Sequence, residues 1–264
     1  PSGQLGTLRT MTEGLQTNTL EMTTQSPGGL ASFLPLMGVL EMPYMYTSHQ
    51  HVYDVVDGEI GQELNEKFLE KTNIRIMGYW MNLYRHTTNN VRPINTPADF
   101  AGLDIRVPET KTVMDTISCL GANAVPMAVG DLYTALSQGQ VDGQENPATI
   151  IEASKYYEVQ KYLSTTGHVY SPTVVMISED FYQSLPEDLR RIVEEEVANA
   201  TQTAREESEK LDEESIERMR EFMEVNDVAD LAPFREAVQP VYDDMVKSLG
   251  QEAQDYFDRI AALG

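Results

Sequence analysis

The sequence has little cysteine and little positive charge. Cys119 is the single cysteine among 264 residues, so no disulfide can form within the chain, and no pattern of Cys and His has the spacing of a zinc site. Lys and Arg number 19 against 42 Asp and Glu, which gives a formal net charge of -23. A chain this acidic repels nucleic acids and anionic membrane surfaces at long range, so we expect no nucleic-acid partner. Its crowded carboxylates also predict higher stability in saline solution.

Long apolar runs and catalytic motifs are absent as well. No stretch approaches the roughly eighteen uninterrupted apolar residues of a membrane span. The sequence has no Gly-x-Ser-x-Gly elbow, phosphate loop, Gly-x-Gly-x-x-Gly turn or His-Glu-x-x-His pair. His49 and His51 stand at a spacing that separates them on a helix, so we expect surface residues rather than metal ligands. An enzyme would have to use His86 or Glu145, for which no partner is evident, and we expect no metal or cofactor.

Strand and helix patterns alternate along the first two thirds of the chain. Ser48 and Thr96-Pro97-Ala98-Asp99 are typical of helix starts, and Pro108 is typical of a strand end. Strands are predicted over 21–25, 74–80, 85–88, 103–107, 124–126 and 140–143, with helices over 8–20, 48–56, 59–71, 97–102, 109–121 and 131–137. This alternation predicts an α/β fold with largely parallel sheets and helices on both faces.

The last third has a different pattern. Ser184-Leu185-Pro186-Glu187 has the form of a capping box, and no Gly or Pro follows Glu187 until Pro233. An apolar stripe continues through this segment, which predicts one very long helix of about 38 residues and roughly 55 Å. We interpret the acidic runs 194–196 and 212–214 as its solvated face.

Two arginines stand out in this acidic chain. Arg85 and Arg106 lie near the carboxyl ends of predicted strands, where ligands collect in open α/β sheets. A guanidinium is a planar fork that suits a ligand carboxylate, but it suits an Asp or Glu side chain equally well. Spacing alone therefore leaves both a ligand contact and a structural ion pair open for each arginine.

Several short motifs connect the chain with a known family. They are Pro1–Gly6, Arg85–Asn89, Ile105–Pro108, Pro126–Met127, Leu132–Leu136, Val141–Pro147 and Tyr156–Tyr162. Together, and in this order, they resemble the solute-binding subunit of tripartite ATP-independent periplasmic (TRAP) transporters, the DctP-type family. The resemblance covers essentially the whole chain.

This resemblance implies a two-lobed α/β periplasmic-binding-protein fold whose lobes close over a ligand, with a long helix across both lobes. We expect residues 1–83 and 172–211 in the first lobe and residues 84–171 and 212–264 in the second. The family begins with a strand and a helix before the segment at Pro1. We therefore expect a longer natural chain, with some ligand contacts in that earlier part.

The resemblance also implies three main site residues. In the family the arginine of the Ile-Arg-Val-Pro motif pairs with the ligand carboxylate, and this position is Arg106. The arginine before the Thr-Asn segment is Arg85, and the asparagine of the Gln-Glu-Asn-Pro motif is Asn146. Asn146 has donors and an acceptor on one short side chain, which suits hydroxyls or a carboxylate oxygen.

Four further positions match family residues near the pocket. Ser26 falls where some members have a polar or acidic contact, and Val129 replaces an aromatic residue of sialic-acid binders. Trp80 and Tyr170 fall near positions that line the pocket, although packing in the core or hinge is an equal alternative for both.

The implied function is capture of a small organic acid in the periplasm by a monomer that delivers it to the integral-membrane TRAP subunits. We expect a sugar acid such as a uronate or aldonate, and a C4-dicarboxylate is the alternative ligand. An enzyme on the same fold is the alternative from another class. The sequence does not separate the two ligand classes.

Overall fold

The computed structural model describes residues 4–264, so Pro1–Gly3 of the predicted opening motif lie outside the described residues. Within 4–264, seven strands form one mixed sheet in the order β1-β6-β2-β5-β3-β4, with β7 paired to β6. The strands are β1 Met22–Gln25, β2 Ile74–Asn89, β3 Asp104–Val107, β4 Asn123–Pro126, β5 Gly143–Asn146, β6 Tyr162–Ser178 and β7 Glu224–Asn226.

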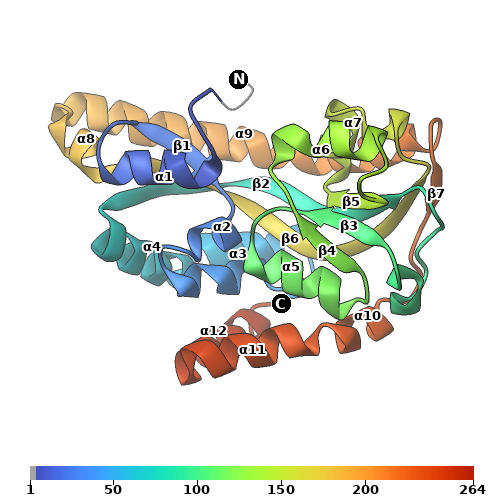
Figure 1. The fold of residues 1–264 in the computed structure, drawn as a ribbon. Coiled ribbons are helices and arrows are strands. Elements are labelled where there is room, and N and C mark those ends of the chain that lie inside the picture. Colours follow the sequence, from blue (N-terminus) through green and yellow to red (C-terminus); the bar gives the residue numbers. More distant parts are fainter. Residues whose placement is uncertain (1–3) are drawn as a thin grey trace.

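The two longest strands, β2 and β6, pair antiparallel and run through both lobes of the molecule (Figure 1). The β1–β6 and β2–β5 pairs are also antiparallel, whereas β3–β4, β3–β5 and β6–β7 are parallel. The prediction of largely parallel sheets is therefore wrong. Segments 74–80 and 85–88 belong to a single strand, and its partner comes from much later in the chain, so no local pattern reveals the direction of pairing.

Helices flank the sheet, and several begin where the sequence predicts. The hydroxyl of Ser48 caps α3, and Thr96 with Asp99 forms a capping box, both as predicted. The hydroxyl of Ser26 caps α2, where no helix was predicted. The α-helices are α1 Leu8–Gln16, α2 Pro27–Leu30, α3 His49–Asp57, α4 Glu59–Thr72, α5 Lys111–Cys119, α6 Val129–Ser137, α7 Ala148–Ala153, α8 Glu179–Ser184, α9 Glu187–Met219, α10 Ala232–Ala237, α11 Gln239–Leu249 and α12 Gln251–Ala261. The 3₁₀ helices are η1 Pro35–Glu41, η2 Pro97–Phe100 and η3 Tyr156–Glu158.

The predicted long helix is α9, which extends along both lobes (Figure 1). It has 33 residues, or about 50 Å at 1.5 Å per residue, and is thus shorter than predicted. It ends at Met219 because Met219 and Met223 turn into a hydrophobic core and β7 follows at once. Strand β5 also differs, since it occupies 143–146 instead of 140–143. Gly139, with φ of +65°, belongs to the turn before it.

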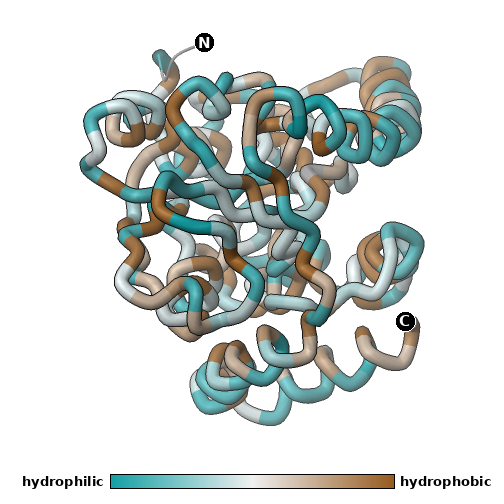
Figure 2. Tube along the Cα trace, turned by 90° about the vertical axis from the view of Figure 1, so that its right-hand side faces the viewer, coloured by the Kyte–Doolittle hydropathy of each residue, from teal (hydrophilic) through white to brown (hydrophobic). Residues whose placement is uncertain are grey.

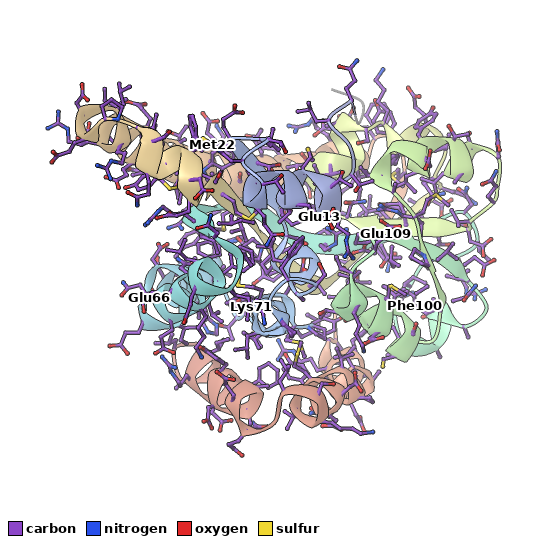
Figure 3. The ribbon with its side chains drawn as sticks, turned by 60° about the vertical axis from the view of Figure 1, so that its left-hand side comes forward. Glu13, Met22, Glu66, Lys71, Phe100 and Glu109 are labelled. Carbon is purple, nitrogen blue, oxygen red and sulfur yellow. The ribbon has the colours of Figure 1, made fainter. Side chains whose placement is uncertain are left out.

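Two hydrophobic clusters hold the fold together. The larger one joins residues of α3, α4, β3, α5 and the C-terminal helices, and the smaller one lies among α6, α7, the start of β6 and the end of α9. Apolar and polar residues alternate within single turns of the outer helices, as an amphipathic helix requires (Figure 2). Figure 3 shows Glu66 on the outer side of α4 and Phe100, which is fully buried, in the opposite lobe.

The C-terminal helices cover the underside of this sheet and touch both halves of the chain. Helix α11 packs against α5, and α12 packs against α4 and η1. His51 is buried beneath α12, with Nε2 2.8 Å from the carbonyl oxygen of Ile260. The expectation that His51 lies on the surface is therefore wrong, because the helix that covers it is remote in sequence. The residue boundaries given for the two lobes stay a prediction.

Candidate ligand-binding site

Three neighbouring strands bring the main predicted site residues together. Arg106 on β3 is in register with Gln144 on β5, and Asn146 at the end of β5 is in register with His86 on β2. Arg85 precedes His86, so Arg85, Asn146 and Arg106 lie at one junction of β2, β5 and β3. All three side chains are buried, at 3–7% exposure. Because burial of a cation is costly unless it is paired, the two buried arginines require negatively charged partners nearby.

Glu145 supplies that charge to Arg85. The Nε of Arg85 donates to Glu145 Oε2 at 2.5 Å and Nη2 donates to Oε1 at 2.7 Å, with a further bond to the Glu145 carbonyl at 2.9 Å. Burial alone would raise the pKa of Glu145, but the charge and hydrogen bonds of Arg85, with His168, outweigh it and hold this pKa at about 2. The ion-pair alternative is thus the observed state of Arg85.

A buried hydrogen-bond network orients Glu145 from its other side. His168 is fully buried, with Nε2 3.1 Å from Glu145 Oε2 and Nδ1 2.8 Å from the hydroxyl of Thr166. The hydroxyls of Thr166 and Thr87 lie 3.2 Å apart, so the network joins β6 to β2. The Glu145 carboxylate on β5 is therefore fixed in place by groups on two other strands, β2 and β6.

Arg106 has a different environment. Its Nε and Nη2 both donate to the carbonyl oxygen of Met127, at 2.9 and 2.6 Å. No carboxylate within residues 4–264 lies at ion-pair distance from Arg106, although the side chain is 3% exposed. Burial lowers the pKa of Arg106, and the negative charge of Glu145 partly offsets this. Of its five N–H donors, three have no partner in the described chain, and they suit an anionic ligand.

Asn146 completes this group. Its Oδ1 accepts a hydrogen bond from Arg85 Nη2 at 3.2 Å, and its Nδ2 donates to Gln144 Oε1 at 2.5 Å. The amide therefore links the Arg85–Glu145 pair to Gln144, which is in register with Arg106. Its ligand role stays a prediction.

Ser26 and Val129 lie outside this hydrogen-bonded group. The hydroxyl of Ser26 accepts from the backbone N–H of Gly29 at 3.2 Å and so serves as a helix cap. Val129 is the first residue of α6 and is 58% exposed. Neither arrangement by itself indicates a ligand contact.

Trp80 and Tyr170 lie on β2 and β6. Tyr170 is 2% exposed, donates to the sulfur of Met81 at 2.9 Å and packs edge-on against Tyr46 and Tyr84. These contacts are those expected if Tyr170 packs in the core or hinge, which was the alternative to lining the pocket. The indole N–H of Trp80 is buried without a hydrogen-bond partner in the described chain, which leaves a donor free.

The sequence-based prediction missed Glu145, His168 and Glu41 as members of this buried polar group. Glu145 is adjacent to Asn146 in its motif, and charge balance could have indicated it, since a buried arginine needs a carboxylate. Glu41 and His168 come from a 3₁₀ helix and from β6, and no sequence signal relates them to β5.

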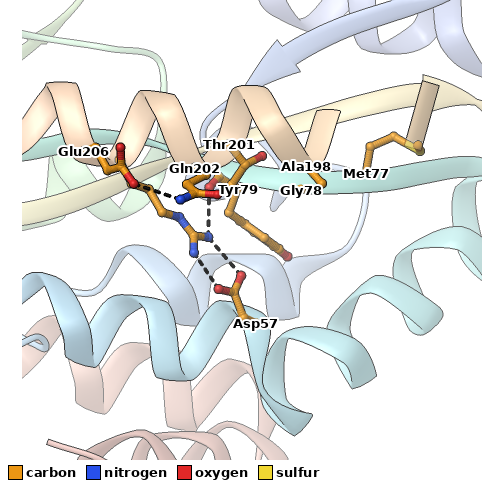
Figure 4. A pocket seen from close by; sticks show the side chains of 9 residues that line it. Asp57, Met77, Gly78, Tyr79, Ala198, Thr201, Gln202 and Glu206 are labelled. Carbon is orange, nitrogen blue, oxygen red and sulfur yellow. Dashed lines mark hydrogen bonds and ion pairs between the residues drawn. The ribbon is translucent and has the colours of Figure 1, made fainter. Parts of the chain in front are cut away.

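A separate surface pocket of about 360 Å³ lies between α9 and β2 (Figure 4). Arg205 on α9 forms an ion pair with Asp57 there and also donates to the Tyr79 carbonyl at 3.1 Å. None of the predicted site residues lines this pocket. Among residues 4–264, no group of three or more His, Cys, Asp and Glu could hold a metal ion, and no helix is apolar over enough length to cross a membrane.

A family model described as bacterial extracellular solute-binding protein, family 7 (DctP), matches residues 1–249. The chain belongs to this family. It is 34% identical over 256 residues to the family relative "Sialic acid-binding periplasmic protein SiaP" of Vibrio cholerae, covering 95% of this chain and 78% of the relative. It is 31% identical over 261 residues to "C4-dicarboxylate-binding periplasmic protein DctP" of Rhodobacter capsulatus, covering 96% and 77%.

Solved structures of TRAP periplasmic solute-binding proteins have the same fold. The protein from Polaromonas sp. JS666 bound to D-erythronate is 37% identical, with a TM-score of 0.90 and coverage of 100% of this chain and 85% of the other. The protein from Sulfitobacter sp. NAS-14.1 with bound β-D-galacturonate is 30% identical, with a TM-score of 0.93 and coverage of 98% and 86%. The predicted family and the two-lobed α/β fold with a long helix are confirmed.

Proposed function

We propose that this chain is the periplasmic solute-binding protein of a TRAP transporter and that it binds a sugar acid such as a uronate or aldonate. The two lobes close over the acid, and the closed monomer delivers it to the integral-membrane subunits. The chain itself performs no reaction. Arg106 holds the ligand carboxylate, and Arg85 and Asn146 bind its remaining oxygens.

The observation that carries this proposal is the buried guanidinium of Arg106, which has no carboxylate partner in the described chain. A buried cation is costly unless it is paired, and a ligand carboxylate would pair it. Arg85 is already paired with Glu145, so Arg106 is the arginine of this group that has no carboxylate partner in the described chain. Structural neighbours with bound galacturonate and erythronate support the sugar-acid class.

A C4-dicarboxylate is the second candidate, favoured by the relative named for that ligand. A thermal-shift screen of uronates, aldonates and C4-dicarboxylates separates the two. A ligand at 100 times its dissociation constant stabilises the native state by about 2.7 kcal/mol. We expect sugar acids to raise the melting temperature more than dicarboxylates do. Larger increases in melting temperature with dicarboxylates would mean that the ligand is a dicarboxylate. A screen in which no acid raises the melting temperature, or chemical alteration of the bound acid, would contradict the proposed function.

A further inference from the structure

A second polar cluster lies beside the Arg85–Glu145 pair. Its centre is Glu41, the last residue of η1, which is 1% exposed and has no Lys, Arg or His within ion-pair distance in residues 4–264. The backbone N–H of Gly28 donates to Glu41 Oε2 at 2.7 Å, and the hydroxyl of Ser171 is bonded to Oε1. Burial raises the pKa of Glu41, against the opposing effects of Ser171 and Arg85.

Glu41 keeps acceptor capacity after these two bonds. A carboxylate has about four lone-pair sites, and Gly28 and Ser171 occupy one on each oxygen. Glu41 bonds to Ser171 on β6, and Gly28, its other partner, lies against Thr110, which follows β3. Glu41 therefore lies beside the strands that carry the proposed carboxylate site, and the charges of Arg85 and Glu145 act on its pKa. A group placed between these residues would meet an acceptor at Glu41.

Thr110 faces Gly28 from the connection between β3 and α5. A Cβ added to Gly28 would lie 3.4 Å from the Cβ of Thr110 and 2.1 Å from Glu41 Oε2, so only glycine fits between the two side chains. Thr110 is 7% exposed, and its hydroxyl has no hydrogen-bond partner within residues 4–264. It stands four residues after Arg106, which lies on β3 just before this connection. A buried hydroxyl without a hydrogen-bond partner indicates that a polar group of a ligand could bond to it.

We propose that Glu41 and Thr110 form a hydroxyl-binding subsite that selects hydroxylated monocarboxylates over dicarboxylates. This inference rests on the proposed function, in which Arg106 binds the carboxylate. Hydroxyls of the ligand donate to Glu41 and accept from Thr110, so that each group gains a hydrogen-bond partner. A second carboxylate would face the oxygens of Glu41 and would find no cation there, which leaves it desolvated and unpaired.

The test uses isothermal titration calorimetry with D-galacturonate and succinate on the wild-type protein, Thr110→Val and Glu41→Gln. Thr110→Val removes the hydroxyl at nearly constant volume, and we expect about tenfold weaker galacturonate binding with succinate binding changed less than twofold. Tenfold corresponds to about 1.4 kcal/mol, the size of one hydrogen bond. Glu41→Gln replaces a carboxylate with an amide, whose N–H can donate to a second carboxylate of the ligand. We therefore expect the ratio of the succinate to the galacturonate dissociation constant to fall by tenfold or more.

Thr116→Val is the matched control. Thr116 is also buried on α5, but its hydroxyl donates to the Thr112 carbonyl, so its removal should leave both affinities unchanged. If galacturonate binds and neither site variant changes the ratio of the two affinities, the subsite is wrong and the proposed function stands. If the wild-type protein binds no organic acid, the proposed function itself fails. Should Glu41→Gln not fold by circular dichroism, Thr110→Val decides alone.

Discussion

Two buried arginines on neighbouring strands differ in what neutralises them. Arg85 makes a two-pronged ion pair with Glu145, whereas Arg106 binds only the carbonyl oxygen of Met127 among the described residues. A backbone carbonyl carries a dipole but no net charge, so it leaves the cation of Arg106 uncompensated. Under the proposed function this difference makes Arg106 the partner of the ligand carboxylate, whereas Arg85, already paired with Glu145, binds the remaining ligand oxygens.

The first prediction is that Arg106→Lys does not retain the ligand affinity of the wild-type protein. Lys keeps the charge but loses the planar fork, so one mobile contact would replace two parallel hydrogen bonds. Arg106→Ala would leave the ligand carboxylate desolvated and unpaired, at a cost of about 2 to 5 kcal/mol, or roughly 30-fold to several thousandfold in affinity. We expect an intermediate loss for Arg106→Lys.

Titration calorimetry measures the affinity of both variants for the ligand that gives the largest shift in the screen, and circular dichroism checks that both variants fold. Arg92→Lys is a suitable control, since the guanidinium of Arg92 donates to the carbonyls of Asp99 and Ala101 and lies outside the site. Affinity changes below about threefold in both Arg106 variants would make Arg106 a structural residue and would move the ligand carboxylate to Arg85.

At the scale of elements, α9 is tied to a helix that positions the site. Glu152 on α7 accepts from Arg218 and Ser215 on α9, with Arg218 Nε at 2.6 Å. Asp212 on α9 is 8% exposed beside Ala148, the first residue of α7, and its Oδ1 has no hydrogen-bond partner in the described chain. Helix α7 begins two residues after Asn146, so these contacts hold the end of β5 against the long helix.

The second prediction follows from the buried carboxyl of Asp212. Burial raises its pKa from 3.8 to about 6, although the Ala148 backbone N–H opposes this. Between these values the folded state binds more protons than the unfolded state, so this group's contribution to stability is present below about pH 4 and is lost as pH rises to about 6. The loss amounts to about 2 to 3 kcal/mol at most.

Asp212→Asn should therefore be more stable than the wild-type protein at pH 7, and the difference should shrink or reverse at pH 4.5. Urea unfolding at the two pH values measures this, and exposed Asp255→Asn on α12 serves as the control. A stability difference between Asp212→Asn and wild type that does not change with pH would show that Asp212 ionises normally in the folded state.

Local chemistry predicts where elements begin better than it predicts how they pair. Ser48 and Thr96 act within a few residues, and the helices that they start were both predicted. The short helix that Ser26 starts was not predicted. The β2–β6 pair joins residues as distant as Ile74 and Ser178, and its antiparallel direction has no local signal.

The candidate site divides in the same way. Arg85, Arg106 and Asn146 lie in recognisable motifs, and the structure brings them together. Glu41 and Thr110 both lie against Gly28 only through tertiary packing of η1, α2 and the connection before α5, and no sequence pattern relates them.

At the scale of the whole molecule, negative charge dominates the surface. The formal charge is -23, and long stretches of α9 present exposed carboxylates, among them Glu196 and Glu207. Many of the ion pairs are also exposed, and pairs of this kind contribute little to stability. Net repulsion should therefore outweigh surface pairing when little salt is present.

The third prediction is that the melting temperature rises with sodium chloride from about 20 mM to 1 M, because the screening length falls from roughly 20 Å to 3 Å. Each 1 kcal/mol of relieved repulsion raises the melting temperature of a chain this size by about 2 to 4 °C. Glu196→Lys combined with Glu207→Lys changes the charge by four units, from -23 to -19, and should reduce the salt effect. Sucrose, which does not screen charge, should act equally on both proteins. A flat or falling curve in sodium chloride would mean that the exposed ion pairs, which salt weakens, matter more than the net charge.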